Sequence, residues 1–171
     1  MKYIKEFEGL RGLMAMWVVL GHWSTTALIS DSIASTKLYN DYAVDVFIIL
    51  SGFAITALLD KRPEKYSHYI ARRVLRIFPV YLVFLLPSAL MAQLTLEVWT
   101  TIPTGFKMPG QIEVATDTVT YFWPHLGAHL IALHGLIPHA ILPNTDYAFV
   151  GQAWSISLEW QFYLVAPLLW L

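Results

Sequence analysis

The segment Leu10–Trp23, LRGLMAMWVVLGHW, is an apolar run that contains two ionisable residues, Arg11 and His22. An ionisable side chain at bilayer depth costs about 2.5 to 3.5 kcal/mol on insertion scales, so a membrane helix that carries one normally faces a protein interior or a wet cavity. The segment therefore predicts a membrane helix whose polar side chains have a functional role.

The composition of the whole chain supports a membrane protein. Of its 171 residues, 57% are hydrophobic and 13% are charged, whereas an ordinary soluble domain has roughly 25% charged residues. The formal net charge of -1 provides no basic surface of the kind that nucleic acid requires, so no nucleic-acid partner is expected. The chain has no cysteine, which excludes disulfides, Cys-ligated metal sites and thiol nucleophiles.

Further apolar segments of spanning length follow the first one. A hydrocarbon core of about 30 Å requires about 20 helical residues, and five segments approach that length: 10–29, 42–59, 77–94, 121–142 and 153–171. Pro79 and Pro87 are expected to bend the third, and residues 95–120 are expected to form an extramembrane loop. The predicted fold is an all-α, multi-pass transmembrane helical bundle of about five spans, incomplete at its C-terminus.

The distribution of Lys and Arg predicts the orientation. Three basic residues, Lys2, Lys5 and Arg11, lie before or at the start of the first span. Six more follow the second span: Lys61, Arg62, Lys65, Arg72, Arg73 and Arg76. Cytoplasmic loops carry such an excess, so a cytoplasmic N-terminus and a place in the cell (inner or plasma) membrane are expected. Strict alternation then puts the turn at Pro143–Gly151 on the cytoplasmic side.

Depths counted along the spans group the polar residues. At a rise of about 1.5 Å per residue, His22 lies about 18 Å and Ser51 roughly 16 Å above the cytoplasmic edge. Asp45 comes out at about 25 Å and Glu159 at about 9 Å on the same rise. This count predicts that His22 and Ser51 lie at one level.

His22 is the best candidate for a general base, since an imidazole can accept and return a proton near neutral pH. A histidine that only donates to a neighbouring helix carbonyl is the plain alternative. Arg11 alone would be interpreted as snorkelling to the headgroups. Together with Asp45 and Glu159 on other spans, however, these residues favour a polar cavity.

Two other groups of polar residues have competing interpretations. The basic run YIARRVLR, residues 69–76, is either an anchor to anionic lipid or a site for a ligand that carries phosphate. Four histidines follow at positions 125, 129, 134 and 139. Spacing places no carboxylate or further ligand among them, so no metal site is predicted and a polar lining or an interfacial position is preferred.

Four segments together resemble a known family: LRGLMAMWVVLGHW, YAVDVFIILSGFAITALL, YIARRVLRIFPVYL and AWSISLEWQFYLVAPLLWL. In order and spacing they are similar to the membrane-bound acyltransferase-3 family, which O-acylates cell-envelope and exported carbohydrates. The family's motifs fall on Arg11 and His22; on Asp45, Phe47, Ser51, Gly52 and Phe53; on Arg72, Arg73 and Arg76; and on Trp154, Ser155, Glu159, Phe162 and Tyr163.

The resemblance implies that residues 1–171 are the N-terminal part of a single membrane acyltransferase domain. The expected activity is transfer of an acyl group, in particular acetyl, from acyl-CoA on the cytoplasmic side to a carbohydrate hydroxyl, with no bound cofactor.

The resemblance implies a separate role for each group of motif residues. His22 acts as the general base and Arg11 holds donor phosphates, as do Arg72, Arg73 and Arg76. Asp45 or Glu159 orients the imidazole or pairs with an arginine. Substrate binding is assigned to Ser51, Trp154, Ser155 and Tyr163, although close helix packing beside Gly52 is an alternative role for Ser51.

Two other functions remain open at this point. The same intramembrane charges would suit a fragment of a transporter or channel. Because the family's membrane domain is longer than this chain, an inactive truncated acyltransferase is also possible. Such a chain would assemble with the missing C-terminal spans or with another membrane protein.

Overall fold

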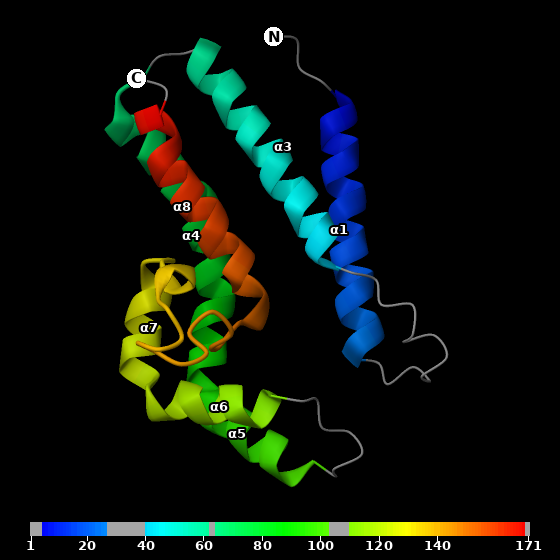
Figure 1. The fold of residues 1–171 in the computed structure, drawn as a ribbon, viewed down its shortest axis with the longest axis vertical. Coiled ribbons are helices and arrows are strands. Elements are labelled where there is room, and N and C mark those ends of the chain that lie inside the picture. The colour runs from blue at the N-terminus through cyan, green and yellow to red at the C-terminus, as the bar shows by residue number, and fades with distance from the viewer. Residues whose placement is uncertain (1–4, 27–39, 62–63, 103–109, 170–171) are drawn as a thin grey trace. The chain divides into compact units, whose positions relative to one another are not determined.

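The computed structural model describes residues 5–26, 40–61, 64–102 and 110–169, which are helical or in turns and contain no strand. The predicted end of the first span at residues 27–29 lies outside these ranges. The chain divides into two compact units, one of residues 1–63 with 170–171 and one of residues 64–169. Figure 1 shows the helices of both units, and each unit is described by itself.

The first unit is an antiparallel pair of helices, α1 (Lys5–Thr26) and α3 (Asn40–Lys61) (Figure 1). Two ring contacts fix their register. Phe7 meets Phe53 edge to face with 5.1 Å between ring centroids, and the Arg11 guanidinium lies 5.7 Å from the centroid of the Phe47 ring. A residue of α1 and a residue of α3 therefore lie opposite each other when their numbers add up to about 59.

This register corrects the predicted depths. Ser51 lies one turn from Phe47, close to the level of Arg11. His22 follows Arg11 by 11 residues, which is about 16 Å of helix, and so lies past the level at which α3 begins. The prediction that His22 and Ser51 lie at one level is therefore wrong. Both helices continue beyond their apolar runs, to Lys5 and to Lys61, so the ends of the apolar runs do not determine how far one helix is shifted along the other.

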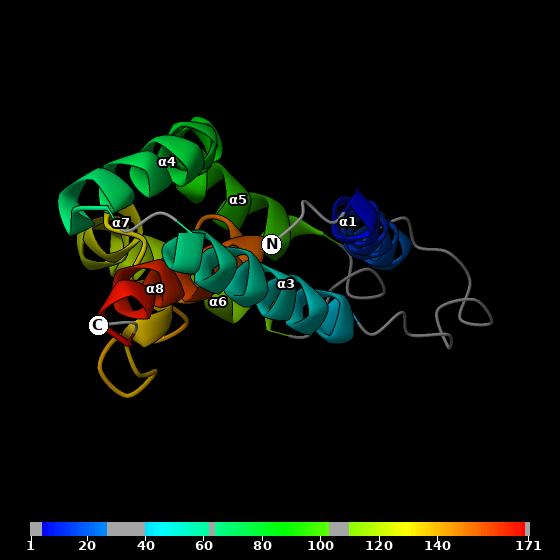
Figure 2. The same cartoon turned by 90° about the horizontal axis from the view of Figure 1, so that it is seen from above.

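The second unit is built around α4 (Tyr66–Leu90) and α8 (Trp154–Leu169), which run antiparallel and in contact (Figures 1 and 2). The Tyr66 hydroxyl donates to the Leu164 carbonyl at 3.1 Å, and the rings of Phe78 and Trp160 meet with centroids 5.3 Å apart. The remaining elements are α5 (Ala92–Thr101), α6 (Gln111–Thr120), α7 (Phe122–Leu130), η2 (His134–Leu136) and η3 (Gly151–Ala153).

Two predicted segments take another form. Residues 95–120 were expected as a loop, but α5 and α6 occupy much of this stretch and pack against each other. The predicted fourth span, 121–142, is not borne out. Its α-helix has only nine residues, about 13 Å of rise, and is followed by turns with Ala132 at a φ of 54°. The prolines and glycines of this stretch explain why no longer helix forms.

The short α7 also changes the topology. Gly151 and Gln152 share a pocket with Ser88 and Ala92, so α8 begins near the end of α4 that is remote from its basic start. The expectation from strict alternation, which placed Pro143–Gly151 on the same side as the basic run, is therefore wrong. That expectation counted residues 121–142 as one crossing, but α7 is too short to cross a membrane.

Within the described residues, two helices have the length and composition to cross a membrane, α3 over Tyr42–Leu59 and α4. On α4 the apolar side chains of Leu75, Val83 and Phe84 are exposed, as expected for a lipid-facing surface. Helix α1 is long enough, but Arg11 and His22 lower its mean hydropathy. The structure thus shows an all-helical protein, without confirming five spans.

Candidate functional site

The basic start of α4 meets the second half of α8 around Arg73. The Arg73 guanidinium lies 5.2 Å from the ring centroid of Tyr69 and 5.1 Å from that of Tyr163. Both tyrosines are buried, at 1% exposure each. A desolvated cation–π contact contributes up to about 2 kcal/mol, so Arg73 joins two helices whose contacting residues are 90 positions apart in the sequence.

Glu159 takes part in the same cluster. It lies one turn before Tyr163 on α8, and the Tyr163 hydroxyl donates to its Oε1. A carboxylate that holds this hydroxyl fixes the rotation of the tyrosine ring against the Arg73 guanidinium. The structure thereby brings together two segments singled out from the sequence, the arginine-rich start of α4 and the Glu159 segment.

The neighbouring arginines are more exposed than Arg73. Arg72 is exposed and forms an ion pair with Glu64, and Arg76 is exposed. The Arg72 side chain is 55% exposed and that of Glu64 is 15% exposed, so solvent and an anion of higher charge can reach the guanidinium group. The three arginines therefore differ: Arg73 is part of the helix packing, whereas Arg72 and Arg76 present guanidinium groups at the surface.

Trp154 and Ser155 start α8, on the side of Glu159 away from Arg73. Both are partly buried, and the Ser155 hydroxyl donates to the Gln152 carbonyl at 3.1 Å. This is a local contact at the helix start, of the kind that serine commonly makes there. The structure does not bring these two residues to the Arg73 cluster.

The remaining predicted residues belong to the first unit. Arg11 is partly buried against Phe47, Ser51 is buried, and Asp45 and His22 are exposed. Arg11 and Ser51 lie near one level of the helix pair, with Asp45 about half a turn from Phe47 toward the His22 end. Within this unit, Arg11 is thus closer to Ser51 and Asp45 than to His22.

A buried histidine core, formed by His129, His134 and Tyr81, was not assigned from the sequence. The two imidazole rings stack in parallel with centroids 3.9 Å apart. His129 Nε2 lies 2.8 Å from the Thr145 carbonyl, and His129 Nδ1 lies 2.8 Å from the Tyr81 hydroxyl. Because a carbonyl only accepts, Nε2 carries the proton and Nδ1 accepts from Tyr81.

Both stacked histidines are neutral. His134 Nε2 lies 3.0 Å from the Ala153 carbonyl, so it too carries its proton on Nε2. Burial lowers the pKa of His129, and the adjacent His134 lowers it further. Burial also lowers the pKa of His134. This core ties α4 to α7 and to the start of α8, and the i, i+4 spacing of His125 and His129 in an apolar stretch was its only sign in the sequence.

The four histidines of this region differ in their surroundings. The described residues contain no group of three or more His, Cys, Asp or Glu side chains arranged to hold a metal ion. His125 is buried, and burial lowers its pKa. His139 lies exposed in the turns after η2. His125, His129 and His134 are fully buried, and none of them lines the pocket described below, so the expected polar lining is not observed for them.

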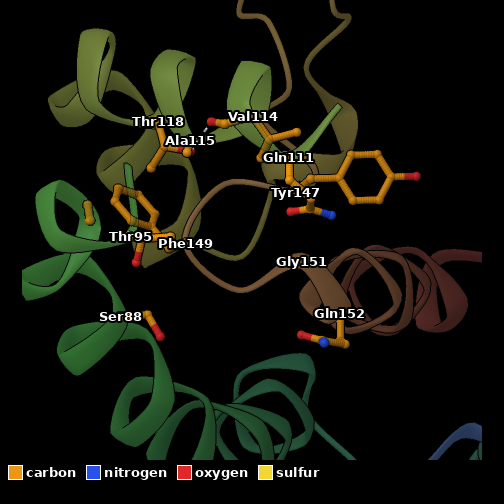
Figure 3. Close-up of a pocket in the computed structure, with 11 residues that line it drawn as sticks. Ser88, Thr95, Gln111, Val114, Ala115, Thr118, Tyr147, Phe149, Gly151 and Gln152 are labelled. Atoms are coloured by element: carbon orange, nitrogen blue, oxygen red, sulfur yellow. Dashed lines mark hydrogen bonds between the residues drawn. The ribbon is translucent and has the colours of Figure 1, made fainter. Parts of the chain in front are cut away.

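A pocket of about 230 Å³ lies at the end of α4 remote from the arginines. Figure 3 shows its lining, which comes from α4, α5, α6 and the stretch that leads into α8. The polar side chains that surround it include Ser88, Thr95, Gln111 and Gln152, and the aromatic ring of Phe149 lies among them. No sequence motif indicates this pocket, because its residues come from four separate segments.

Comparisons with known proteins agree with the motifs. A family model described as an acyltransferase domain, that of acyltransferase-3, matches residues 4–171. Acyltransferase MdmB of Streptomyces mycarofaciens is 27% identical over 96% of this chain. The chain spans 38% of the length of that relative. No solved structure shows significant similarity.

The family match covers all four segments that carried the resemblance, and it identifies a transferase rather than a transporter or channel. The chain therefore belongs to the acyltransferase-3 family of acyltransferase domains.

Proposed function

We propose that this chain is part of an integral membrane O-acyltransferase that moves an acyl group, in particular acetyl, from acyl-CoA to a hydroxyl of a cell-envelope carbohydrate. In this proposal α1, α3, α4 and α8 cross the cell membrane. The excess of Lys and Arg around the end of α3 and the start of α4 puts that loop, and hence the N-terminus, in the cytoplasm.

The observation that carries the proposal is the difference in burial and contacts among the three arginines at the start of α4. Arg73 is held between Tyr69 and Tyr163, which anchors this turn of the helix on α8. Arg72 and Arg76 remain at the surface, where guanidinium groups can form bidentate contacts with phosphate. A rigid turn with two accessible arginines on the cytoplasmic side suits the phosphates of acyl-CoA.

His22 is the proposed general base. It removes the proton from the acceptor hydroxyl as that oxygen attacks the thioester carbonyl carbon. The carbon–sulfur bond then breaks, and the protonated imidazole returns the proton to the departing thiolate. Glu159 acts as a positioning residue, since it holds Tyr163 against Arg73.

The test uses the intact enzyme that contains this chain, reconstituted in phospholipid vesicles with radiolabelled acetyl-CoA and a panel of methyl glycosides. Transfer of label to a glycoside is expected, and His22→Ala should abolish it while the helical circular-dichroism spectrum is unchanged. His139→Ala is the matched control, because this exposed histidine lies outside the proposed site, and it should keep the activity. Transfer that survives His22→Ala removes His22 from the mechanism, and the absence of transfer by the wild-type enzyme that contains this chain contradicts the proposal.

A further inference from the structure

The pocket at the far end of α4 has the chemistry of a site for a neutral polar molecule. None of its eleven lining residues is charged. In Figure 3 the carboxamides of Gln111 and Gln152 lie on different sides of the space, with the Ser88 and Thr95 hydroxyls on another side. The lining offers no group of opposite sign to a charged ligand, so an uncharged ligand fits best.

The hydrogen-bonding groups match hydroxyls in particular. A carboxamide offers both donors and an acceptor. The hydroxyls of Thr95 and Thr118 donate to the carbonyls of Met91 and Val114, so their oxygens keep acceptor capacity toward the pocket. A ligand hydroxyl donates and accepts at once, and such a lining can satisfy both functions for several hydroxyls.

Phe149 supplies an apolar surface in the same pocket. Its backbone has a φ of 56°, in the left-handed region that is an outlier for a bulky residue. Its ring meets the His129 ring edge to face at 5.5 Å between centroids, so the buried histidine core supports it from behind. Backbone strain of this kind is found at ligand sites, and an aromatic ring can pack on the carbon-bound hydrogens of a sugar ring.

Size and position narrow the ligand further. The volume of about 230 Å³ is below the roughly 300 to 1,000 Å³ of pockets for drug-sized ligands, and it suits one ring-sized group. Ser88 follows Arg73 by 15 residues of α4, about 22 Å of helix. The pocket is therefore separated from the proposed donor phosphates by most of the thickness of a hydrocarbon core.

We propose that this pocket binds a single uncharged, hydroxyl-rich ring, namely the monosaccharide unit that accepts the acyl group. The binding of a neutral sugar is argued from the pocket alone, whereas its role as acceptor rests on the proposed function. The site lies at the end of α4 that the proposed orientation places on the outer side, and donor and acceptor thus approach from opposite faces of the membrane.

The absence of cysteine from the sequence allows a direct test. Gln152→Cys and, as a second variant, Gln111→Cys are introduced into the full chain in vesicles, and the rate of thiol labelling by methyl methanethiosulfonate is measured. Neutral methyl glycosides of glucose, galactose, mannose and rhamnose are the probes, with methyl glucuronide as the charged comparison. Gln93→Cys is the matched control, because Gln93 is an exposed glutamine on α5 outside the pocket.

At least one neutral glycoside should slow labelling at positions 152 and 111 at least fivefold, whereas methyl glucuronide should not, and labelling at position 93 should be unchanged. An unchanged helical circular-dichroism spectrum of each variant shows that it has folded, and labelling in the absence of sugar shows that its thiol is accessible. No protection by any neutral glycoside, or equal protection by the glucuronide, overturns the proposal. Protection without acyl transfer keeps the sugar site and overturns the proposed function instead.

Discussion

The contact of Arg73 with Tyr163 should be measurable as a coupling free energy between α4 and α8. The guanidinium lies 5.1 Å from the centroid of a ring that is 1% exposed. A desolvated cation–π pair contributes about 1 to 2 kcal/mol, which corresponds to roughly a 5- to 30-fold change in the unfolding equilibrium. A double-mutant cycle of Arg73→Met and Tyr163→Leu isolates this quantity, because the cost of each single substitution cancels.

The assay is unfolding in detergent micelles, followed by far-ultraviolet circular dichroism. The control cycle replaces Arg72 by Met, because Arg72 is exposed and paired with Glu64, and it should show no coupling with Tyr163→Leu. Tyr163→Phe keeps the ring and removes only the hydroxyl bonded to Glu159. A second cycle, in which Tyr163→Phe replaces the wild type and is compared with Tyr163→Leu, should therefore show the same coupling to Arg73→Met. A coupling below about 0.3 kcal/mol, the level of simple additivity, would refute the packing role of Arg73.

Three further predictions concern the buried parts of the second unit. Tyr81→Phe leaves His129 Nδ1 buried without its donor, and the free energy of unfolding should fall by about 1 to 3 kcal/mol. Burial lowers the pKa of His129 and His134, so the unfolded state binds protons that the folded core does not bind. The free energy of unfolding should therefore be constant above pH about 6.5 and decrease as the pH falls below that value. A melting temperature that stays constant from pH 7.5 to 5 would contradict this. Gly135→Ala puts a Cβ 3.1 Å from the buried Ser157 Oγ, and the overpacking should cost about 1 to 3 kcal/mol in the same unfolding assay.

The sequence was sufficient to predict the helical class and the family. Long apolar runs identified α1, α3, α4 and α8, and the family motifs carried the assignment to an acyltransferase. It failed where tertiary contacts decide the outcome. The Pro- and Gly-rich stretch 121–142 had enough apolar residues for a span, but its helix ends at Leu130, and no periodicity indicates where such a helix stops.

The candidate site was predictable only in part, for a related reason. The motif spacing named Arg73 and Glu159, but only the antiparallel packing of α4 and α8 shows that Tyr69 and Tyr163 enclose Arg73. Likewise, the level of His22 depended on the register of α1 and α3, which the Phe7 and Arg11 ring contacts set. Residues that meet through such packing leave no local signal in the sequence.

The most direct test of the proposed donor site is the affinity of the reconstituted full chain for acetyl-CoA, measured by equilibrium dialysis. Arg72→Gln and Arg76→Gln each remove a charged hydrogen-bonding group worth about 1.5 to 3 kcal/mol, so Kd should rise by about 10- to 150-fold. Lys65→Gln removes the same charge just before α4 begins and should change Kd less than threefold. Unchanged affinity in both arginine variants, or an equal loss with Lys65→Gln, would contradict a donor site at the start of α4.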